Sequence, residues 1–95
     1  MANAYIIGHI TVRDSDKWLE YRSKVPATLE SWGGELVFRG KLSSVLSGSH
    51  NHSNTVVIRF SDLKALTGWH ASPEYQSLIP LRQEAAEMDL LIFEE

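Results

Sequence analysis

Apolar side chains occupy both faces of the stretch 4–12, which predicts the first strand of the chain. Successive side chains of a strand point to opposite faces, so Ile6 and Ile10 lie on one face while Tyr5 and Ile7 lie on the other. A strand with one face in water alternates apolar and polar residues instead. Something must therefore cover the second face, and we expect this cover to be a second copy of the protein.

A helix is predicted after this strand, because apolar residues recur there at steps of three and four positions. Its apolar face comprises Trp18, Tyr21, Val25, Leu29 and Trp32. Asp14, Ser15 or Asp16 can accept hydrogen bonds from the first free amides of the helix. Pro26 lacks a backbone donor, so we expect a kink or a restart of the helix there, and not its end. The pair Gly33-Gly34 favours the left-handed ending of a helix.

The stretch 35–41 predicts the second strand of the chain. Strict alternation places Leu36 and Phe38 on the face towards the helices. The same alternation places Val37 and Arg39 on the opposite face.

Gly40 is expected to mark a bulge in this strand, because a glycine inside a strand weakens regular pairing. Residues 44–46 predict a short extra strand, and the polar run 47–54 predicts a hairpin tip. The β-branched stretch 55–60 predicts the next long strand.

A second helical region is predicted to start at Ser61 or Asp62, either of which can serve as an N-cap. Its apolar positions are Leu63, Leu66, Trp69, Tyr75, Leu78 and Ile79. Ser72-Pro73 predicts a restart of the helix, as an N-cap followed by proline at the first helical position. Pro80 predicts another break, and residues 81–87 are good helix formers.

Residues 88–93 predict the closing strand, and the elements then follow the ferredoxin-like split β-α-β order. This is an α+β fold with helices on one face of an antiparallel sheet, and we expect one such domain over residues 1–95. The opposite face collects Tyr5, Ile7, Val37, Val57, Leu91 and Phe93. An apolar face of this kind exceeds what a monomer ordinarily exposes, so a homodimer is predicted.

Composition and charge exclude several partners. The net charge is −3 and no run of basic residues exists, so nucleic acid is not an expected partner. The chain has no cysteine, which excludes disulfides and thiolate chemistry. No apolar run approaches the ~20 residues of a membrane-spanning helix, and no secretion signal is visible. We expect a cytoplasmic protein without a membrane partner.

A series of short motifs runs along nearly the whole chain. In order they are Tyr21-Arg22-Ser23-Lys24-Val25-Pro26, Gly33-Gly34, Arg39-Gly40, Phe60, Ser72-Pro73-Glu74-Tyr75, Pro80-Leu81-Arg82 and Asp89. In combination they closely resemble the domain of unknown function 1330 family. The resemblance implies a ferredoxin-like fold in the dimeric α/β-barrel superfamily, whose sheets pack face to face across a two-fold axis. That superfamily includes cofactor-free monooxygenases, haem enzymes, lactone isomerases and binding proteins, so the fold alone does not choose a function.

Five polar-tipped side chains are candidates to line a cleft between the helices and the sheet. They are Tyr21, Trp69, His70, Tyr75 and Arg82. Their rings supply apolar walls and their tips supply aimed donors, which is the usual composition of a ligand pocket. The alternative is that Trp69 and Tyr75 belong to the core, with their polar tips satisfied at its rim. The two also look similar to the tryptophan and tyrosine that line the substrate cavity of the small monooxygenases.

Three polar residues are expected on the face away from the helices. His9 can shuttle a proton or contact an anion there, or it can be a hydrogen-bonded interface residue. Arg39 and Arg59 can each grip a carboxylate in a bidentate way. The alternative for both arginines is an ion pair, with Glu35 or with an acid of the partner chain.

His50 and His52 stand two positions apart in the polar hairpin tip, and no third ligand accompanies them. We therefore expect no metal site there. The sequence also lacks a phosphate-binding glycine loop, a nucleophile elbow and an HExxH motif.

Three functions are compatible with these candidates. The first is a protein that binds a small, partly apolar anion, and its candidate ligand-binding residues are His9, Tyr21, Arg39, Trp69, Tyr75 and Arg82. The second is a cofactor-free monooxygenase or isomerase acting on an aromatic or enolic substrate. The third is a structural interaction domain whose cleft is filled. None of the three requires a cofactor.

Overall fold

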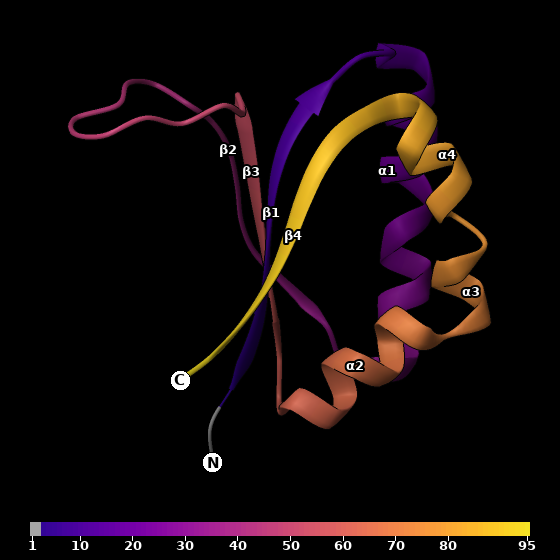
Figure 1. Cartoon of the computed structure of the whole chain (residues 1–95). Helices are drawn as coiled ribbons and strands as arrows, with labels where there is room; N and C mark the ends of the chain where they lie inside the picture. Colours follow the sequence, from indigo (N-terminus) through magenta and orange to yellow (C-terminus); the bar gives the residue numbers. More distant parts are fainter. Residues whose placement is uncertain (1–2) are drawn as a thin grey trace.

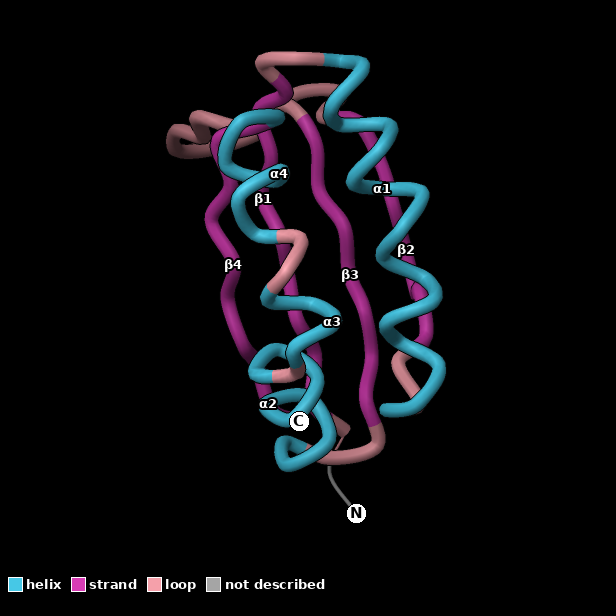
Figure 2. Tube along the Cα trace, turned by 90° about the vertical axis from the view of Figure 1, so that its right-hand side faces the viewer, coloured by secondary structure: helices cyan, strands magenta, loops and turns pink. Residues whose placement is uncertain are grey.

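A four-stranded antiparallel sheet with helices on one face forms the structure, a computed structural model that describes residues 3–95 (Figure 1). In chain order the elements are β1 (Ala4–Val12), α1 (Ser15–Leu29), the 3-10 turn η1 (Glu30–Trp32), β2 (Glu35–Lys41), β3 (Asn54–Phe60), α2 (Leu63–Ala71), α3 (Pro73–Gln76), α4 (Ile79–Ala85) and β4 (Ala86–Glu94). The strands lie in the order β2-β3-β1-β4, and the helices form a single layer over them (Figure 2). The predicted ferredoxin-like α+β fold is confirmed.

The hydrophobic core lies between the sheet and this helix layer. Its most deeply buried large side chains are Trp69, Tyr75, Phe60, Ile10 and Leu66. Ile6, Ile10 and Phe60 thus point towards the helices, as alternation predicts. We call the other side of the sheet the outer face. Over the described chain, no helix has both the length and the apolar character needed to cross a membrane.

The predicted helix ends are present as specific caps. Asp14 accepts a hydrogen bond from the Lys17 amide (3.1 Å), and Asp62 accepts one from the Ala65 amide (2.7 Å). Gly33 has φ 69°, in the left-handed region that favours glycine after a helix. These local contacts fix where the helical segments begin and end.

The prolines interrupt the helices less than predicted. α1 passes through Pro26 and ends at Leu29, so the prediction that Pro26 does not end the helix is confirmed, while the helix does not stop and restart there. Pro80 lies in the first turn of α4, where a missing amide costs nothing, and the interruption falls just before it. α4 ends at Ala85, because Ala86 already pairs with Val12 of β1.

The alternation of faces shifts once within β2. Leu36 pairs with Ile58, but Phe38 pairs with Val57, so Val37 is an extra residue in this strand. Such a bulge sets two residues of one strand against one residue of its neighbour. The residues beyond it therefore take the opposite faces from those that simple alternation predicts.

This bulge turns Arg39 towards the helices. Arg39 pairs with Val56, a buried residue of the core side, whereas Phe38 lies on the outer face and is 55% exposed. The prediction that placed Phe38 inward and Arg39 outward is therefore wrong. Gly40 is not the bulge, since it pairs regularly with Thr55; the Phe38 ring packs over it and leaves no room for a side chain.

Residues 42–53 form one long loop instead of a strand and a hairpin tip. The predicted strand at 44–46 is wrong, because no strand within residues 3–95 pairs with it. A hydrogen bond from the Leu42 amide to the Ser53 carbonyl closes the base of the loop (2.7 Å). Figure 1 shows the loop projecting beyond the sheet on the side away from the helices.

The outer face carries large apolar side chains that stay half exposed. Leu91 and Phe93 of β4 are 41% and 50% exposed, and they pair with Ile7 and Tyr5 of β1. Arg59, on the same face, forms an ion pair with Glu35 (Nη2 to Oε2, 3.2 Å), which confirms the ion-pair interpretation for this arginine.

Candidate functional site

Two aromatic rings form the floor of a cavity between the helices and the sheet. Trp69 of α2 and Tyr75 of α3 are 2% and 0% exposed, and their ring centroids lie 4.2 Å apart. The Trp69 ring also packs on Phe60 of β3, with 5.6 Å between centroids. Both rings therefore belong to the core, and both also line the cavity described below.

A break between α2 and α3 turns the Tyr75 ring towards Trp69. The Ser72 hydroxyl donates to the Trp69 carbonyl (2.6 Å) and accepts from the Tyr75 amide (3.3 Å). Ser72 thus ends α2 and caps α3, and Pro73 follows at the first helical position. The predicted restart of the helix is confirmed. In an unbroken helix six positions turn about 600°, which leaves two side chains on different sides.

A chain of hydrogen bonds satisfies the polar tips of these rings. Arg82 Nη1 donates to the Tyr75 hydroxyl (2.8 Å), and this hydroxyl shares a hydrogen bond with the Tyr21 hydroxyl (2.9 Å). Trp69 Nε1 donates to Thr28 Oγ1 (2.9 Å). Burial, and then the neighbouring Tyr75, raise the pKa of Tyr21 above its ordinary value, so its phenol stays neutral.

Tyr75→Phe is expected to lower the free energy of unfolding by about 1–3 kcal/mol, because the buried Tyr21 and the half-buried Arg82 lose a shared hydroxyl. Denaturant unfolding measures this loss. Ser23→Ala is the control: its hydroxyl donates to the Glu20 carbonyl at an exposed position of α1 (2.7 Å), so deletion of this hydroxyl should cost less than about 0.5 kcal/mol. Equal losses in the two variants would contradict a structural role for the buried chain.

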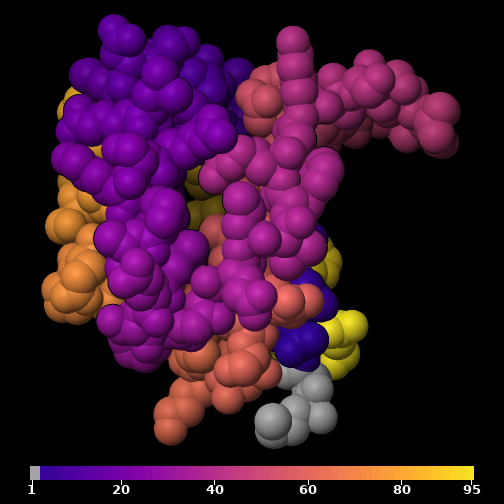
Figure 3. Space-filling view, turned by 180° about the vertical axis from the view of Figure 1, so that it is seen from behind, coloured from indigo at the N-terminus to yellow at the C-terminus, as the bar shows by residue number. Residues whose placement is uncertain are grey.

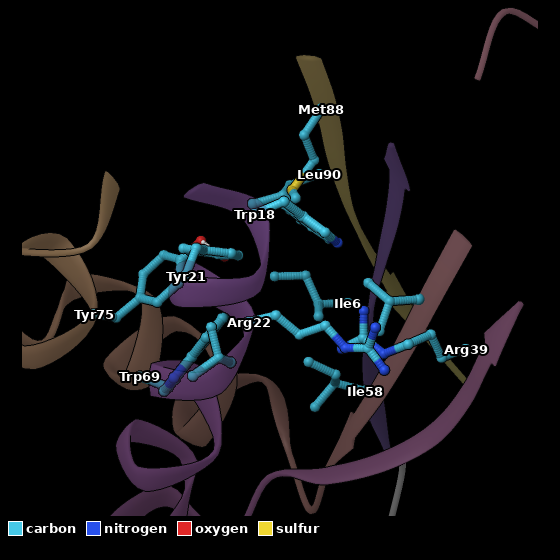
Figure 4. A pocket seen from close by; sticks show the side chains of 12 residues that line it. Ile6, Trp18, Tyr21, Arg22, Arg39, Ile58, Trp69, Tyr75, Met88 and Leu90 are labelled. Carbon is cyan, nitrogen blue, oxygen red and sulfur yellow. Dashed lines mark hydrogen bonds between the residues drawn. The ribbon is translucent and has the colours of Figure 1, made fainter. Parts of the chain in front are cut away.

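The cavity itself opens between α1 and the sheet (Figure 4). Its lining comprises Ile6, Trp18, Tyr21, Arg22, Val25, Arg39, Val56, Ile58, Trp69, Tyr75, Met88 and Leu90. The empty space out to its mouth is about 410 Å³, but only about 30 Å³ admits the centre of a water molecule. In this conformation the cavity therefore has room for one or two waters, and a larger ligand requires side chains at the mouth to move.

Two arginines from different elements meet at this mouth. Arg22 projects from α1 and Arg39 from β2, and Figure 4 shows their guanidinium groups converging. Within residues 3–95, neither guanidinium lies within 4.0 Å of a carboxylate oxygen. Burial, and then the charge of Arg22, lower the pKa of Arg39. Figure 3 shows the hollow between α1 and β2 that these two side chains border.

The structure brings together four of the six predicted binding residues. The four that line the cavity are Tyr21, Arg39, Trp69 and Tyr75. Arg82 stands behind Tyr75 and reaches the cavity only through the Tyr75 hydroxyl. His9 lies on the outer face, where its Nδ1 hydrogen-bonds Thr55 Oγ1 (3.2 Å). His70 packs against Tyr75, with 5.5 Å between ring centroids, and is not part of the lining.

Arg22 and Trp18 complete the cavity, and the sequence had not singled them out as binding residues. Trp18 stands one helical turn before Arg22, so both share the edge of the apolar stripe of α1. This spacing is the signal that was available. A charged residue beside an apolar stripe is ordinarily solvated, so the spacing alone does not separate Arg22 from any surface arginine.

Three histidines gather at the base of the long loop, far from this cavity. The ring centroids of His9 and His50 lie 4.9 Å apart, and those of His50 and His52 lie 6.1 Å apart. Both ring nitrogens of His52 are engaged, with Thr11 Oγ1 (2.9 Å) and Asp89 Oδ2 (3.1 Å). In the described part of the chain, no group of three His, Cys, Asp or Glu side chains could hold a metal ion.

Comparison with protein families identifies the chain. The sequence profile described as Domain of unknown function (DUF1330) matches residues 3–95. The chain belongs to the DUF1330 family. The resemblance carried by its short motifs is therefore confirmed over nearly the whole sequence. No protein of curated function matches it by sequence.

Solved structures share the fold of this DUF1330 protein. RPA0582 from Rhodopseudomonas palustris, a protein of unknown function, is 15% identical with a TM-score of 0.84, over 99% of this chain and 82% of that one. A dimeric ferredoxin-like protein of unknown function from Jannaschia sp. CCS1 is 14% identical with a TM-score of 0.79, over 98% and 99%. SnoaB from Streptomyces nogalater, a cofactor-independent oxygenase, is 13% identical with a TM-score of 0.72, over 98% and 92%. At these identities the likeness shows the fold alone.

Proposed function

We propose that this DUF1330 protein binds a small, partly apolar anion in the cavity between α1 and the sheet. The observation that carries the proposal is the convergence of Arg22 and Arg39 at the cavity mouth, where no carboxylate oxygen of residues 3–95 lies within 4.0 Å of either guanidinium. Arginine binds carboxylates through paired, charge-assisted hydrogen bonds. Behind the arginines the walls are aromatic, so a planar apolar body with one anionic group fits both parts of the site.

Ligand entry is proposed to move the arginines rather than the floor. Trp69 and Tyr75 are held by ring packing and by hydrogen bonds to Thr28 and Arg82. Arg22, in contrast, is an exposed side chain on the surface of α1. Swinging it outward enlarges the mouth at little cost, and an anion between the two guanidinium groups offsets their mutual repulsion.

The proposal predicts that anions bind more tightly than neutral molecules of the same shape. We expect 2-naphthoate to bind at least about tenfold more tightly than 2-naphthamide, because only the carboxylate has a charge opposite to that of the guanidinium groups and two oxygens for paired hydrogen bonds. Isothermal titration calorimetry on the wild-type protein measures both affinities. Equal affinity for the acid and the amide would remove the basis of the proposal, and no binding of either would favour an interaction domain with a filled cleft.

A second candidate function is turnover of an aromatic or enolic anion without a cofactor. The fold that the chain shares with SnoaB, a cofactor-independent oxygenase, supports this candidate. Two guanidinium groups beside an aromatic wall would stabilise negative charge that develops on an enolate. Oxygen consumption with hydroxylated aromatics, lost in Trp69→Phe while ligand binding persists, would select it. Binding without turnover would select the first function.

We also propose that the protein is a homodimer that buries the outer face of the sheet. The half-exposed side chains of Phe38, Leu91 and Phe93 on this face support the proposal, as does the dimeric ferredoxin-like description of the Jannaschia protein. His9 would then be an interface residue. The cytoplasmic location and the lack of a nucleic-acid partner stay predictions from composition.

A further inference from the structure

The anion site does not use the loop 42–53, which we call the arm. The C-terminal end of the arm is fastened to the sheet, and the Leu42 amide joins the other end to it through the Ser53 carbonyl (2.7 Å). The Ser53 amide donates to the Ile10 carbonyl (3.1 Å), and His52 is held between Thr11 and Asp89. These contacts tie the base of the arm to β1 and β4.

The tip of the arm, in contrast, touches little of its own chain. Within residues 3–95, no hydrogen bond or ion pair joins 43–49 to another part of the chain. Gly48 has φ 82°, a left-handed conformation that lets the tip reverse direction. Leu46 at the tip is 98% exposed, with Val45 beside it. The anchored base thus holds an exposed leucine in water. Burying a leucine side chain is strongly favourable, so Leu46 is well placed to contact another molecule.

The direction and reach of the arm indicate what Leu46 contacts. Figures 1 and 3 both show the arm projecting on the side of the sheet away from the helices, which is the side of the half-exposed outer face. About six extended residues span up to about 20 Å, whereas two sheets packed face to face lie about 10 Å apart. An arm of this length therefore reaches past the sheet of a second copy.

We propose that the arm clasps a second copy of this chain, with Leu46 buried against the edge of the partner's sheet. This inference rests on the homodimer proposed above and extends it to a surface outside the two sheets. The arm contains no lysine, arginine, aspartate or glutamate, so it lacks the cluster of permanent positive charges that holds an anionic membrane or a nucleic acid. Its apolar tip projects on the same side of the sheet as the apolar outer face, so a second copy that covers this face also lies within reach of the tip.

Leu46→Ser tests the inference, and sedimentation equilibrium gives the Kd of the dimer. We expect this variant to raise the Kd at least about 100-fold, because each of two arms loses a buried leucine. Leu46→Met is the matched control, and the Kd of its dimer should stay within about threefold of the wild-type value, since it keeps an apolar side chain of similar volume. Because Leu46 is exposed within one chain, both variants should unfold at the wild-type midpoint when monomeric.

The possible outcomes distinguish the arm proposal from the homodimer proposal and from the anion-binding proposal. If the wild-type protein is a dimer and Leu46→Ser leaves its Kd unchanged, the proposed role of the arm is overturned, whereas the proposed interface between the two sheets is not. A wild-type monomer at micromolar concentration overturns both, while naphthoate binding is measured independently. Since the chain has no cysteine, Leu46→Cys also accepts a single photo-crosslinker. A crosslink to a second copy supports the inference, and crosslinks only to vesicles or to another protein overturn it.

Discussion

Replacing both Arg22 and Arg39 by glutamine is expected to weaken 2-naphthoate binding at least about 100-fold and to leave 2-naphthamide binding within about threefold. Each hydrogen bond to a charged group contributes about 1.5–3 kcal/mol, and the variant loses two such interactions with the carboxylate. The amide carries no charge, and the glutamine side chains can still donate hydrogen bonds to its carbonyl, so its affinity should change little. Calorimetric titration of the two ligands against wild type and variant gives all four affinities.

The same variant separates binding from folding. Neither arginine has a carboxylate partner within 4.0 Å in residues 3–95, and the two positive charges face each other. Their removal should therefore leave the thermal midpoint unchanged or raise it slightly. A double variant that replaces Lys24 and Lys64 by glutamine removes the same net charge from exposed helix positions and should keep wild-type affinity. Equal weakening of naphthoate in both double variants would attribute the effect to net charge rather than to the site.

Much of the fold follows from local sequence signals. Asp14, Asp62 and Ser72 cap helices because their short side chains reach the free amides of the next turn. The apolar positions of α1 recur at helical spacing, and those of β1 and β3 recur at strand spacing, so each element has one obvious inner side. The order of these elements then leaves few topologies open.

The bulge in β2 depends on pairing and not on the residues of β2 alone. Leu36, Val37 and Phe38 are all apolar, so the alternation carries no signal of a change of face in this strand. The change appears only because Phe38, and not Val37, stands opposite Val57. Arg39 consequently faces the cavity, and a prediction based on strict alternation places it on the wrong side of the sheet.

The candidate site likewise has parts that the sequence predicts and parts that it does not. Tyr21 and Trp69 occupy apolar positions of helices, so their burial and their polar tips are predictable from spacing. The meeting of Arg22 with Arg39 is not predictable in this manner, because it depends on the distance between α1 and β2 in the folded chain. The arm is a third case: its β-forming Val45 has no neighbouring strand, so propensity alone does not make a strand there.

Val57→Glu is the change expected to act most strongly on assembly, and it should convert the protein to a monomer at micromolar concentration. Val57 lies on β3, inside the sheet, between Phe38 of β2 and Ile7 of β1. In a homodimer joined by outer faces this position lies in the interior of the interface. Burying a carboxylate there without a partner costs several kcal/mol, and a two-fold dimer buries two of them.

The monomer, in contrast, should tolerate this substitution, because an outer face in water leaves the new carboxylate solvated. Circular dichroism is expected to be unchanged, while sedimentation velocity shows the smaller species. Val57→Thr, which keeps the β-branched shape and adds no charge, should dissociate to an intermediate extent. Thr67→Glu adds the same charge on an exposed position of α2 and should leave the dimer intact. If Val57→Glu sediments as the wild-type protein does, the partner lies on another surface, and the half-exposed Phe38, Leu91 and Phe93 need a different cover.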